Sequence, residues 1–231
     1  TLSWEFMQLD TITELDPAFE RAYGFGAPFI STLRRDAEGG KILLQKWVRR
    51  RPDNWRSHYT LGLHLFQEFQ DYQAAAPLIL KAASLSRAPQ WLSALGVRLL
   101  SEGGFYLHAL KTATEVFDAV RDKEGRLRLK ARIRTLNYHV QKNAWDNALK
   151  DYLKTHARPP NSIAQLRDLL RTHVRELSSV IGSEKLAPEV SSILRETFAF
   201  QYDKIGRKIV SEIPLETLGI ERPGIYHENG R

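Results

Sequence analysis

Apolar residues recur at steps of three and four residues along most of the chain up to residue 155, and turn residues separate the stretches. This spacing is typical of amphipathic helices that bury one face. It predicts helix hairpins over about 18–54, 55–89, 90–122 and 126–155. The first helix is expected to begin at Asp16-Pro17, because aspartate caps helices and proline suits the first helical turn.

These hairpins share a sequence repeat. Leu61-Gly62 returns as Leu95-Gly96 after 34 residues (95 − 61 = 34), and Ala75 returns as Ala109 at the same spacing. Gly40 precedes Ala75 by 35 residues (75 − 40 = 35), which places the first hairpin in register with the second. Small residues at such positions allow two helices to approach closely, where a larger side chain would separate them. A period of about 34 residues indicates an array of helix–turn–helix units.

One stretch gives two conflicting patterns. Residues 126–134 alternate strictly between charged and apolar side chains, which on its own indicates a half-exposed strand. An apolar stripe from Leu129 to Val140, however, continues at helical spacing. Because the repeat also requires a helix here, helix is the favoured interpretation. Its partner helix is expected at 144–155, with Ala148 in the small-residue position.

The helical register ends at Pro159-Pro160, and a different organisation follows. A helix is expected after Asn161-Ser162, and a short one from Pro188 to about Thr197. Aromatic and β-branched residues on both sides of a glycine-containing turn at 203–206 then predict a small β-hairpin.

The tail, residues 213–231, is too short to make its own core and too apolar for a typical disordered end. We expect its contacts to be made by Leu215, Leu218, Ile220 and Tyr226. The tail can pack along its own chain or lie on a neighbouring subunit. Its spaced apolar residues favour the neighbouring subunit.

In these features the chain resembles the tetratricopeptide-repeat family. The likeness rests on Leu61-Gly62, Asp71-Tyr72 and Ala75 in one unit, and on Leu95-Gly96 and Ala109 in the next.

The resemblance implies an all-α fold. A right-handed solenoid of about four helix hairpins would occupy residues 1–157, and C-terminal helices, the small β-hairpin and the extended tail would occupy 158–231. Such solenoids hold other proteins, so the resemblance implies a non-catalytic scaffold or assembly subunit whose partners are other protein subunits. Phrases such as Arg50-Arg51-Pro52-Asp-Asn-Trp55 further resemble bacterial members of the family, several of which are envelope-associated. They imply a place at the cell envelope, peripheral or anchored by a segment upstream of Thr1, with the cytoplasm as the alternative.

In this family, inward-facing residues of the first helix of each hairpin line a concave groove that binds a partner. Carried onto this sequence, the groove residues form a mixed apolar and basic set: Arg21, Arg56, Tyr59, Leu63, Phe66, Gln67, Val97 and Leu100. Tyr59, Leu63 and Phe66 would anchor the partner, and the two arginines would orient it. The alternative is that the protein's own C-terminal region fills this groove.

The net charge of +7 fits an acidic partner, an anionic membrane surface or nucleic acid, or else a solvated surface with surplus lysine and arginine. Candidate contacts to an anionic surface form one dense series: Arg126, Arg128, Lys130, Arg132 and Arg134. An anionic membrane surface is therefore a second candidate partner. Nucleic acid is not expected as a partner, except under the alternative function of a basic-surface binder of nucleic acid or anionic lipid.

We expect no catalytic site, no metal site, no cofactor and no small-molecule substrate. The chain has no cysteine, which excludes disulfides, thiolate metal sites and a cysteine nucleophile. Its 7 histidines do not form the paired helical spacing of a zinc site. Gly24-Phe25-Gly26 lacks the third glycine of a dinucleotide-binding loop. No apolar run reaches the length of about 18 residues that a transmembrane helix requires.

Overall fold

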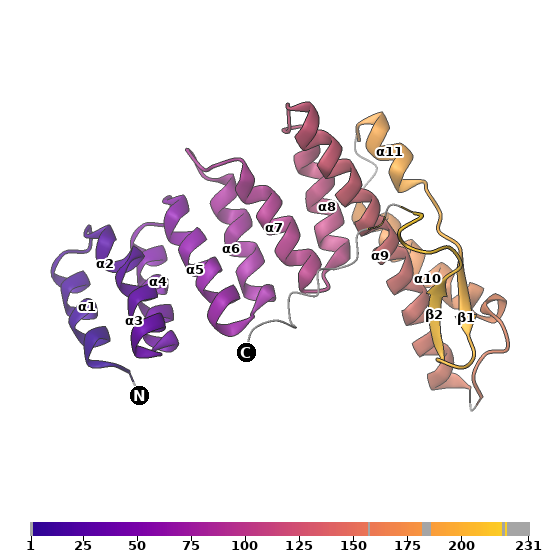
Figure 1. Cartoon of the computed structure of the whole chain (residues 1–231), viewed down its shortest axis with the longest axis horizontal. Helices are drawn as coiled ribbons and strands as arrows, with labels where there is room; N and C mark the ends of the chain where they lie inside the picture. Colours follow the sequence, from indigo (N-terminus) through magenta and orange to yellow (C-terminus); the bar gives the residue numbers. More distant parts are fainter. Residues whose placement is uncertain (1, 157, 182–185, 219, 221–231) are drawn as a thin grey trace. The chain divides into compact units, whose positions relative to one another are not determined.

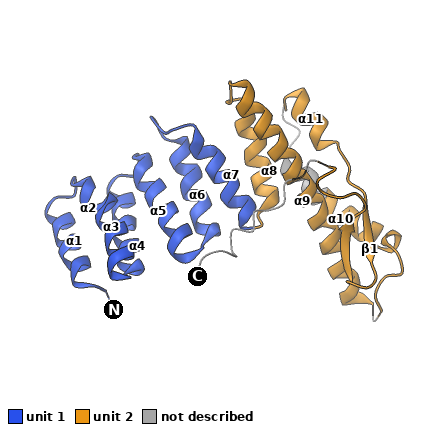
Figure 2. Ribbon diagram, viewed as in Figure 1, with its two compact units in different colours: residues 1–103 blue, residues 104–231 orange. Residues whose placement is uncertain are grey.

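The computed structural model describes residues 2–156, 158–181, 186–218 and 220, with side chains for all of these except 175–181. The described chain is mostly helical and carries one small antiparallel sheet (Figure 1). The expected helical class with a C-terminal β-hairpin is therefore confirmed. The chain divides into two compact units, residues 1–103 and 104–231 (Figure 2). This division falls at a glycine pair, well before the boundary at 157/158 that the sequence predicts.

The N-terminal unit is a row of short helices that pack on their neighbours in sequence. These helices are α1 (Trp4–Leu15), α2 (Glu20–Gly24), α3 (Gly26–Arg34), α4 (Ala37–Arg50), α5 (Trp55–Phe69), α6 (Tyr72–Ser84) and α7 (Trp91–Glu102). Helix α3 packs on α4, α4 on α5, α5 on α6 and α6 on α7 (Figure 1). The predicted hairpin over 55–89 is confirmed and consists of α5 and α6.

Polar side chains determine where several of these helices begin. Asp36, Asn54 and Asp71 each accept a hydrogen bond from a backbone N–H group in the first turn of α4, α5 and α6, at 2.8–3.0 Å. They satisfy N–H groups that the first turn of a helix leaves without a partner. At the end of α5, Gln70 adopts a left-handed conformation with φ of 53°, and this residue turns the chain toward α6.

Small residues bring consecutive helices into close contact at equivalent positions. A Cβ atom at Gly62 in α5 would lie 3.1 Å from the carbonyl oxygen of Ala75 in α6. One repeat earlier, a Cβ atom at Gly40 in α4 would lie 3.0 Å from the carbonyl oxygen of Ala27 in α3. Both members of the pair are shifted by 35 residues (62 − 27 = 35 and 75 − 40 = 35). The same contact therefore occurs twice, with the glycine exchanged between the partners.

The sequence does not predict helix α1, and Asp16 does not start a helix. Asp16 instead ends α1 and accepts a hydrogen bond from the backbone N–H of Ala18 at 3.0 Å. Helix α1 is joined to α4 by Lys46, whose Nζ lies 2.7 Å from Oδ1 of Asp10 and 2.6 Å from Oε1 of Glu14. The Lys46 side chain is 7% exposed. Burial alone would lower the pKa of Lys46, but the hydrogen bonds to Asp10 and Glu14 outweigh it and raise the pKa.

The C-terminal unit is built around one long helix. Its elements are α8 (Tyr106–Phe117), α9 (Lys123–Thr155), the 3₁₀ helix η1 (Ile163–Leu166), α10 (Arg167–Ile181), α11 (Pro188–Leu194), β1 (Phe200–Asp203) and β2 (Lys208–Ser211). Helix α9 contacts α8, α10, α11, η1 and β2. The strands pair antiparallel, with Phe200 opposite Ser211, as the predicted hairpin requires. Within the described residues, no helix combines the length and the apolarity needed to cross a membrane.

The fourth predicted hairpin does not form. Residues 123–155 make a single α-helix of 33 residues, without a turn between 126–140 and 144–155. The intervening Gln141-Lys142-Asn143 holds no glycine or proline that would end a helix. The helical interpretation of 126–134 is confirmed, and the strand interpretation is wrong.

The described end of the chain packs back onto α9. The buried core of this unit consists of Tyr138, Ala148, Leu149, Leu166, Phe200, Ile209 and Ile220. Leu215 and Leu218 pack against the same cluster. The expectation that the tail lies on a neighbouring subunit is therefore wrong for Leu215, Leu218 and Ile220, because these side chains complete the core of their own unit. Tyr226 lies outside the described residues.

His139 is buried in α9 between aromatic neighbours. Its ring stacks on Tyr106 with the centroids 4.6 Å apart, and it meets Tyr138 edge-on at 5.3 Å. Burial, together with the nearby charges of Lys142 and Arg132, lowers the pKa of His139 to about 4. The imidazole is therefore neutral in the folded protein at neutral pH.

Replacing Ala75 with leucine should destabilise the N-terminal unit by about 1–3 kcal/mol. Ala75 is fully buried at the close contact with Gly62, so the added carbon atoms have no space. The matched control is Gln73→Leu, which adds a leucine at an exposed position of the same helix and should change the free energy of unfolding by about 0.5 kcal/mol or less. Urea denaturation measures both, and equal stability of the two variants would contradict the close contact.

Acidification should destabilise the C-terminal unit through His139. The unfolded histidine takes up its proton near the ordinary pKa of 6.5, whereas the folded one takes it up only near a pKa of about 4. The unfolded state therefore binds more protons between these values. Stability should fall as the pH drops through this window, by about 3 kcal/mol in total.

Amide hydrogen exchange of α8 and α9, corrected for intrinsic rates, measures this effect. His139→Phe should preserve a stacked ring and abolish the loss of protection at acidic pH. His108→Phe removes an exposed imidazole from α8 and should retain the loss. The same pH dependence in His139→Phe as in the unmodified protein would exclude His139 as its source.

Candidate binding site

A pocket lies on the N-terminal unit between α2, α4 and α5. Helix α2 contacts both of the other helices, and the pocket encloses about 340 Å³. Its lining consists of Glu20, Arg21, Gly24, Phe25, Trp47, Trp55, Arg56, Tyr59 and Thr60. The volume is at the lower end of the range of about 300–1,000 Å³ for ligand pockets. It therefore suits a side chain with its flanking main chain rather than a folded element.

The indole of Trp47 forms the most buried part of this lining. Its ring stacks almost parallel on Tyr23, with the centroids 5.8 Å apart and an interplanar angle of 8°. A carbon of the same ring lies 3.4 Å from the position that a Cβ atom at Gly24 would take. The indole is therefore packed directly against the backbone of α2, which limits the depth of the pocket.

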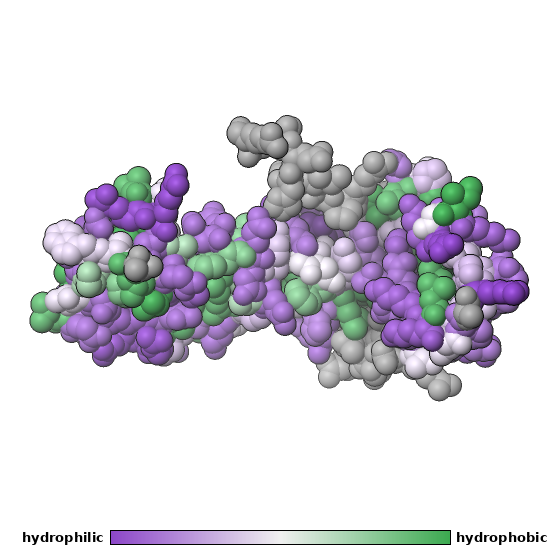
Figure 3. Space-filling model, turned by 90° about the horizontal axis from the view of Figure 1, so that it is seen from below, coloured by the Kyte–Doolittle hydropathy of each residue, from purple (hydrophilic) through white to green (hydrophobic). Residues whose placement is uncertain are grey.

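Aromatic side chains of α5 extend the apolar wall. The rings of Trp55 and Tyr59 lie 6.1 Å apart, and Tyr59 meets Trp91 edge-on at 5.5 Å. Phe25, on the other side of the lining, is 76% exposed. In the space-filling view, apolar residues (green) interrupt the polar surface of the N-terminal unit (Figure 3). Exposed apolar side chains gathered around a concavity are typical of interaction surfaces.

Two guanidinium groups border the pocket without a carboxylate partner. Among the described residues, neither Arg21 nor Arg56 forms an ion pair, in contrast to the cations of α3 and α4 that pair with carboxylates of α1. The guanidinium of Arg56 lies over the ring of Trp55, 4.7 Å from its centroid, and this cation–π contact orients it. The neighbouring carboxylate of Glu20 accepts a hydrogen bond from Nδ2 of Asn54 at 2.9 Å instead.

The structure brings together three of the residues that the sequence assigns to the groove: Arg21, Arg56 and Tyr59. Leu63 and Phe66 follow on the same helix but do not line the pocket. Leu63 is half-buried, and Phe66 packs edge-on against a tyrosine of α6 with the ring centroids 5.3 Å apart. Phe66 is therefore part of the packing between α5 and α6.

The remaining groove residues lie outside the pocket as well. Gln67 is exposed on α5. Val97 and Leu100 of α7 are 2% and 8% exposed. Their assignment to an accessible groove is corrected, because the surrounding protein covers both side chains.

Phe25, Trp47 and Trp55 line the pocket, although the sequence does not single them out for binding. A signal for Phe25 exists in the repeat, because Phe25 and Thr60 are 35 residues apart (60 − 25 = 35), as Arg21 and Arg56 are (56 − 21 = 35). Equivalent positions of consecutive hairpins face the same side of a stack. Residues at equivalent positions of two repeats are therefore expected to line the same pocket. The contribution of Trp47 to the lining depends on tertiary packing instead.

The basic series on α9 is largely paired within the chain. Its members are Arg126, Arg128, Lys130, Arg132 and Arg134. Three form ion pairs: Arg128 with Glu124, Lys130 with Glu189, and Arg134 with Glu196. Arg126 lies over the ring of Phe117, 4.4 Å from its centroid, and Arg132 also interacts within the chain. This pairing reduces the positive charge that an anionic surface would meet.

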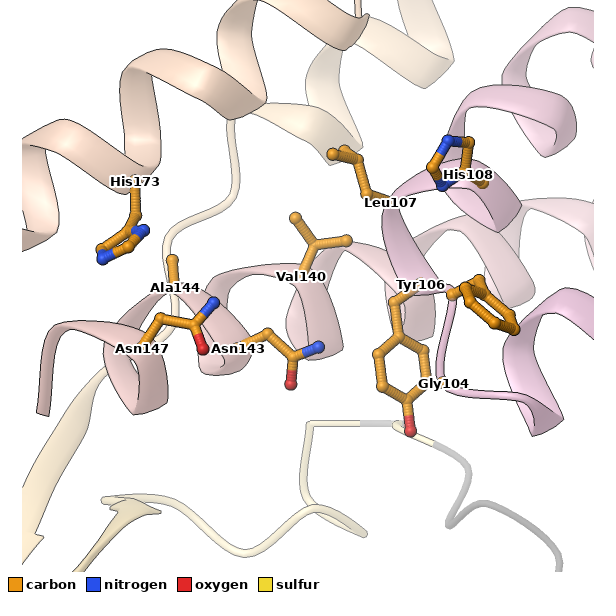
Figure 4. Close-up of a pocket in the computed structure, with 10 residues that line it drawn as sticks. Gly104, Tyr106, Leu107, His108, Val140, Asn143, Ala144, Asn147 and His173 are labelled. Carbon is orange, nitrogen blue, oxygen red and sulfur yellow. The ribbon is translucent and has the colours of Figure 1, made fainter. Parts of the chain in front are cut away.

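A smaller cleft of about 220 Å³ lies in the C-terminal unit, lined by residues of α8, α9 and α10 (Figure 4). Asn143 and Asn147, one turn apart on α9, and His173 of α10 supply polar groups. His173 is held by Oδ2 of Asp151 at 3.0 Å, and hydrogen bonds from Lys154 and His173 lower the pKa of Asp151. The cleft offers hydrogen bonds rather than an activated nucleophile. In the part of the chain that the structure describes, no group of three or more His, Asp or Glu side chains could hold a metal ion.

Comparison with known proteins does not identify a family for this chain. No protein-family model, no curated protein and no solved structure shows a significant match. The resemblance to tetratricopeptide-repeat proteins therefore stays a prediction from the residues.

Proposed function

We propose that this protein is a non-catalytic scaffold of the tetratricopeptide-repeat type that binds another protein through the pocket of its N-terminal unit. The repeat is supported by the paired contacts of Ala27 with Gly40 and of Gly62 with Ala75, which are 35 residues apart in the sequence. Helix hairpins stacked in this way present concave surfaces that other proteins occupy.

The pocket itself is the observation that carries the proposal. It combines Trp55, Tyr59 and the exposed Phe25 with the guanidinium groups of Arg21 and Arg56. Tryptophan, tyrosine and arginine are the residues that most often dominate the free energy of protein–protein binding, especially where they surround a concavity. No hydrolytic or redox chemistry is needed to account for this set.

The proposed cellular location of this interaction depends on the sequence resemblance alone. Because the sequence resembles envelope-associated bacterial repeat proteins, we place the complex at the cell envelope. Partner isolation should therefore use native membranes as well as the soluble fraction.

The alternative function, a basic-surface binder of nucleic acid or anionic lipid, has less support. Its main candidates on α9 are engaged by Glu124, Glu189 and Glu196 of the same chain. Phosphate binding would weaken steeply with salt, whereas binding at a pocket with apolar walls would not. A salt titration of the isolated complex separates the two functions.

Truncating Phe25 to alanine should release the partner without unfolding the protein. Phe25 lines the pocket but is 76% exposed, so its removal should change the free energy of unfolding by about 0.5 kcal/mol or less. An aromatic anchor of an interface contributes about 2 kcal/mol or more, which corresponds to a dissociation constant about thirtyfold higher. Affinity isolation with quantitative mass spectrometry should show the loss, and Tyr59→Ala should show it too.

Glu68→Ala is the matched control, because Glu68 is exposed on α5 and does not line the pocket. It should retain every protein that the unmodified chain retains. Circular dichroism and melting curves of each variant exclude unfolding as the cause of a loss. Undiminished recovery of the same proteins by both pocket variants would rule out this pocket as the binding site.

A further inference from the structure

We infer that the segment bound in the pocket of the N-terminal unit is an acidic peptide segment that carries a large apolar side chain next to its carboxylate. The inference rests on the proposed function, because it specifies the chemistry of the partner at the same pocket. Three features carry it: two arginines that form no ion pair among the described residues, an apolar wall in the same lining, and the hydrogen bond from Asn54 that engages the lining carboxylate, Glu20.

The pocket lining carries an excess of positive charge, because it holds two arginines and one glutamate. Several cations elsewhere in the unit are paired within the chain, as Arg34 is with Glu5 at 2.6 Å and Lys46 with Asp10 and Glu14. Arg21 and Arg56, both at the rim of the pocket, have no such partner among the described residues. Since they occupy equivalent positions of consecutive hairpins, they present two guanidinium groups to one concavity.

Arg56 is oriented for a carboxylate. Its guanidinium lies over the Trp55 ring, 4.7 Å from the centroid, and the side chain is exposed, so N–H groups that do not contact the ring are accessible. Those groups match the two oxygens of a carboxylate in a bidentate geometry, which a lysine could not reproduce. The rings of Trp55 and Tyr59 and the exposed Phe25 then provide the contact for an adjacent apolar side chain.

The same lining disfavours a basic segment. It contains two arginines and one glutamate, and the carboxylate of that residue, Glu20, is already hydrogen-bonded to Asn54. A lysine or arginine entering the pocket would meet two like charges, and such juxtaposition is a strong source of discrimination between partners. The occupant that satisfies both the charge and the apolar wall is an aspartate or glutamate beside a leucine, phenylalanine or similar residue.

The test selects random peptides displayed on phage against the immobilised full chain, followed by fluorescence anisotropy with fluorescein-labelled peptides of the selected sequences. The unmodified protein should enrich peptides with an acidic residue beside a large apolar one. The double variant Arg21→Glu with Arg56→Glu should weaken the binding of these peptides by about thirtyfold or more. When this double variant is immobilised as the target of the selection, the selected peptides should carry lysine or arginine in place of the acidic residue.

The matched control is Arg51→Glu with Arg87→Glu, which makes the same change of net charge at two exposed arginines outside the pocket. It should bind the acidic peptides as the unmodified protein does. An equal loss of binding in both double variants would overturn the inference, because general electrostatic attraction would explain it.

Three further outcomes bear on the inference and on the function on which it rests. Enrichment of purely apolar or basic peptides whose binding depends on Phe25 would overturn the acidic chemistry and leave the proposed function intact. No enrichment over an empty surface would count against both. A fluorescein-labelled duplex DNA bound more tightly than any selected peptide, and lost in the Arg21→Glu, Arg56→Glu variant alone, would replace the peptide with a phosphate-bearing partner.

Discussion

The N-terminal unit depends on the close approach of three helices at Gly40. A Cβ atom there would lie 3.0 Å from the carbonyl oxygen of Ala27 in α3 and 2.9 Å from the ring of His64 in α5. His64 also contacts the carbonyl oxygen of Ala37 at 2.9 Å through Nε2, which joins α5 to the first turn of α4. Because the backbone of α4 is approached from both sides, α2 and α5 can flank Trp47 farther along the same helix. The pocket is thus a consequence of the packing that builds the repeat.

The unit places carboxylates beside its buried lysine, whereas neither arginine of the pocket forms an ion pair among the described residues. Lys46 loses most of its contact with water, and this cost is offset by Asp10 and Glu14 from α1. Arg21 follows directly on Glu20 in the sequence, yet that carboxylate is hydrogen-bonded to Asn54. Among the residues that the structure describes, the lack of an ion pair at Arg21 therefore does not reflect a shortage of acidic residues nearby. A hydrated arginine at the rim of a concavity costs the fold little, and its charge stays available for recognition.

Local signals account for the elements that the sequence predicts correctly. The caps at Asp36 and Asp71 and the glycine-containing turn of the β-hairpin act within a few residues, so they can be identified without the fold. Helix α1 also has a capping residue, because Oγ of Ser3 accepts a hydrogen bond from the backbone N–H of Phe6 at 3.1 Å. Its apolar residues do not mark a single buried face, however, since Trp4, Met7 and Leu15 remain exposed. The pocket can be predicted from the sequence only in part. Two of its charges follow from the repeat, whereas Trp47 becomes part of the lining only through its packing against the backbone of α2.

Ala148, at the end of the sequence repeat, shows how much of the packing a small residue can predict. Ala148 fits the position at which a hairpin partner approaches closely, and it is indeed fully buried. The core cluster to which it belongs, however, contains Leu166, Phe200 and Ile209 of the C-terminal segments. A small residue such as alanine indicates that another element packs closely at this position, but it does not indicate which element that is. Because α9 continues as one helix, the face that a fourth hairpin would have used is occupied by η1, β1 and β2. The competing core, rather than a change in helical periodicity, therefore ends the repeat.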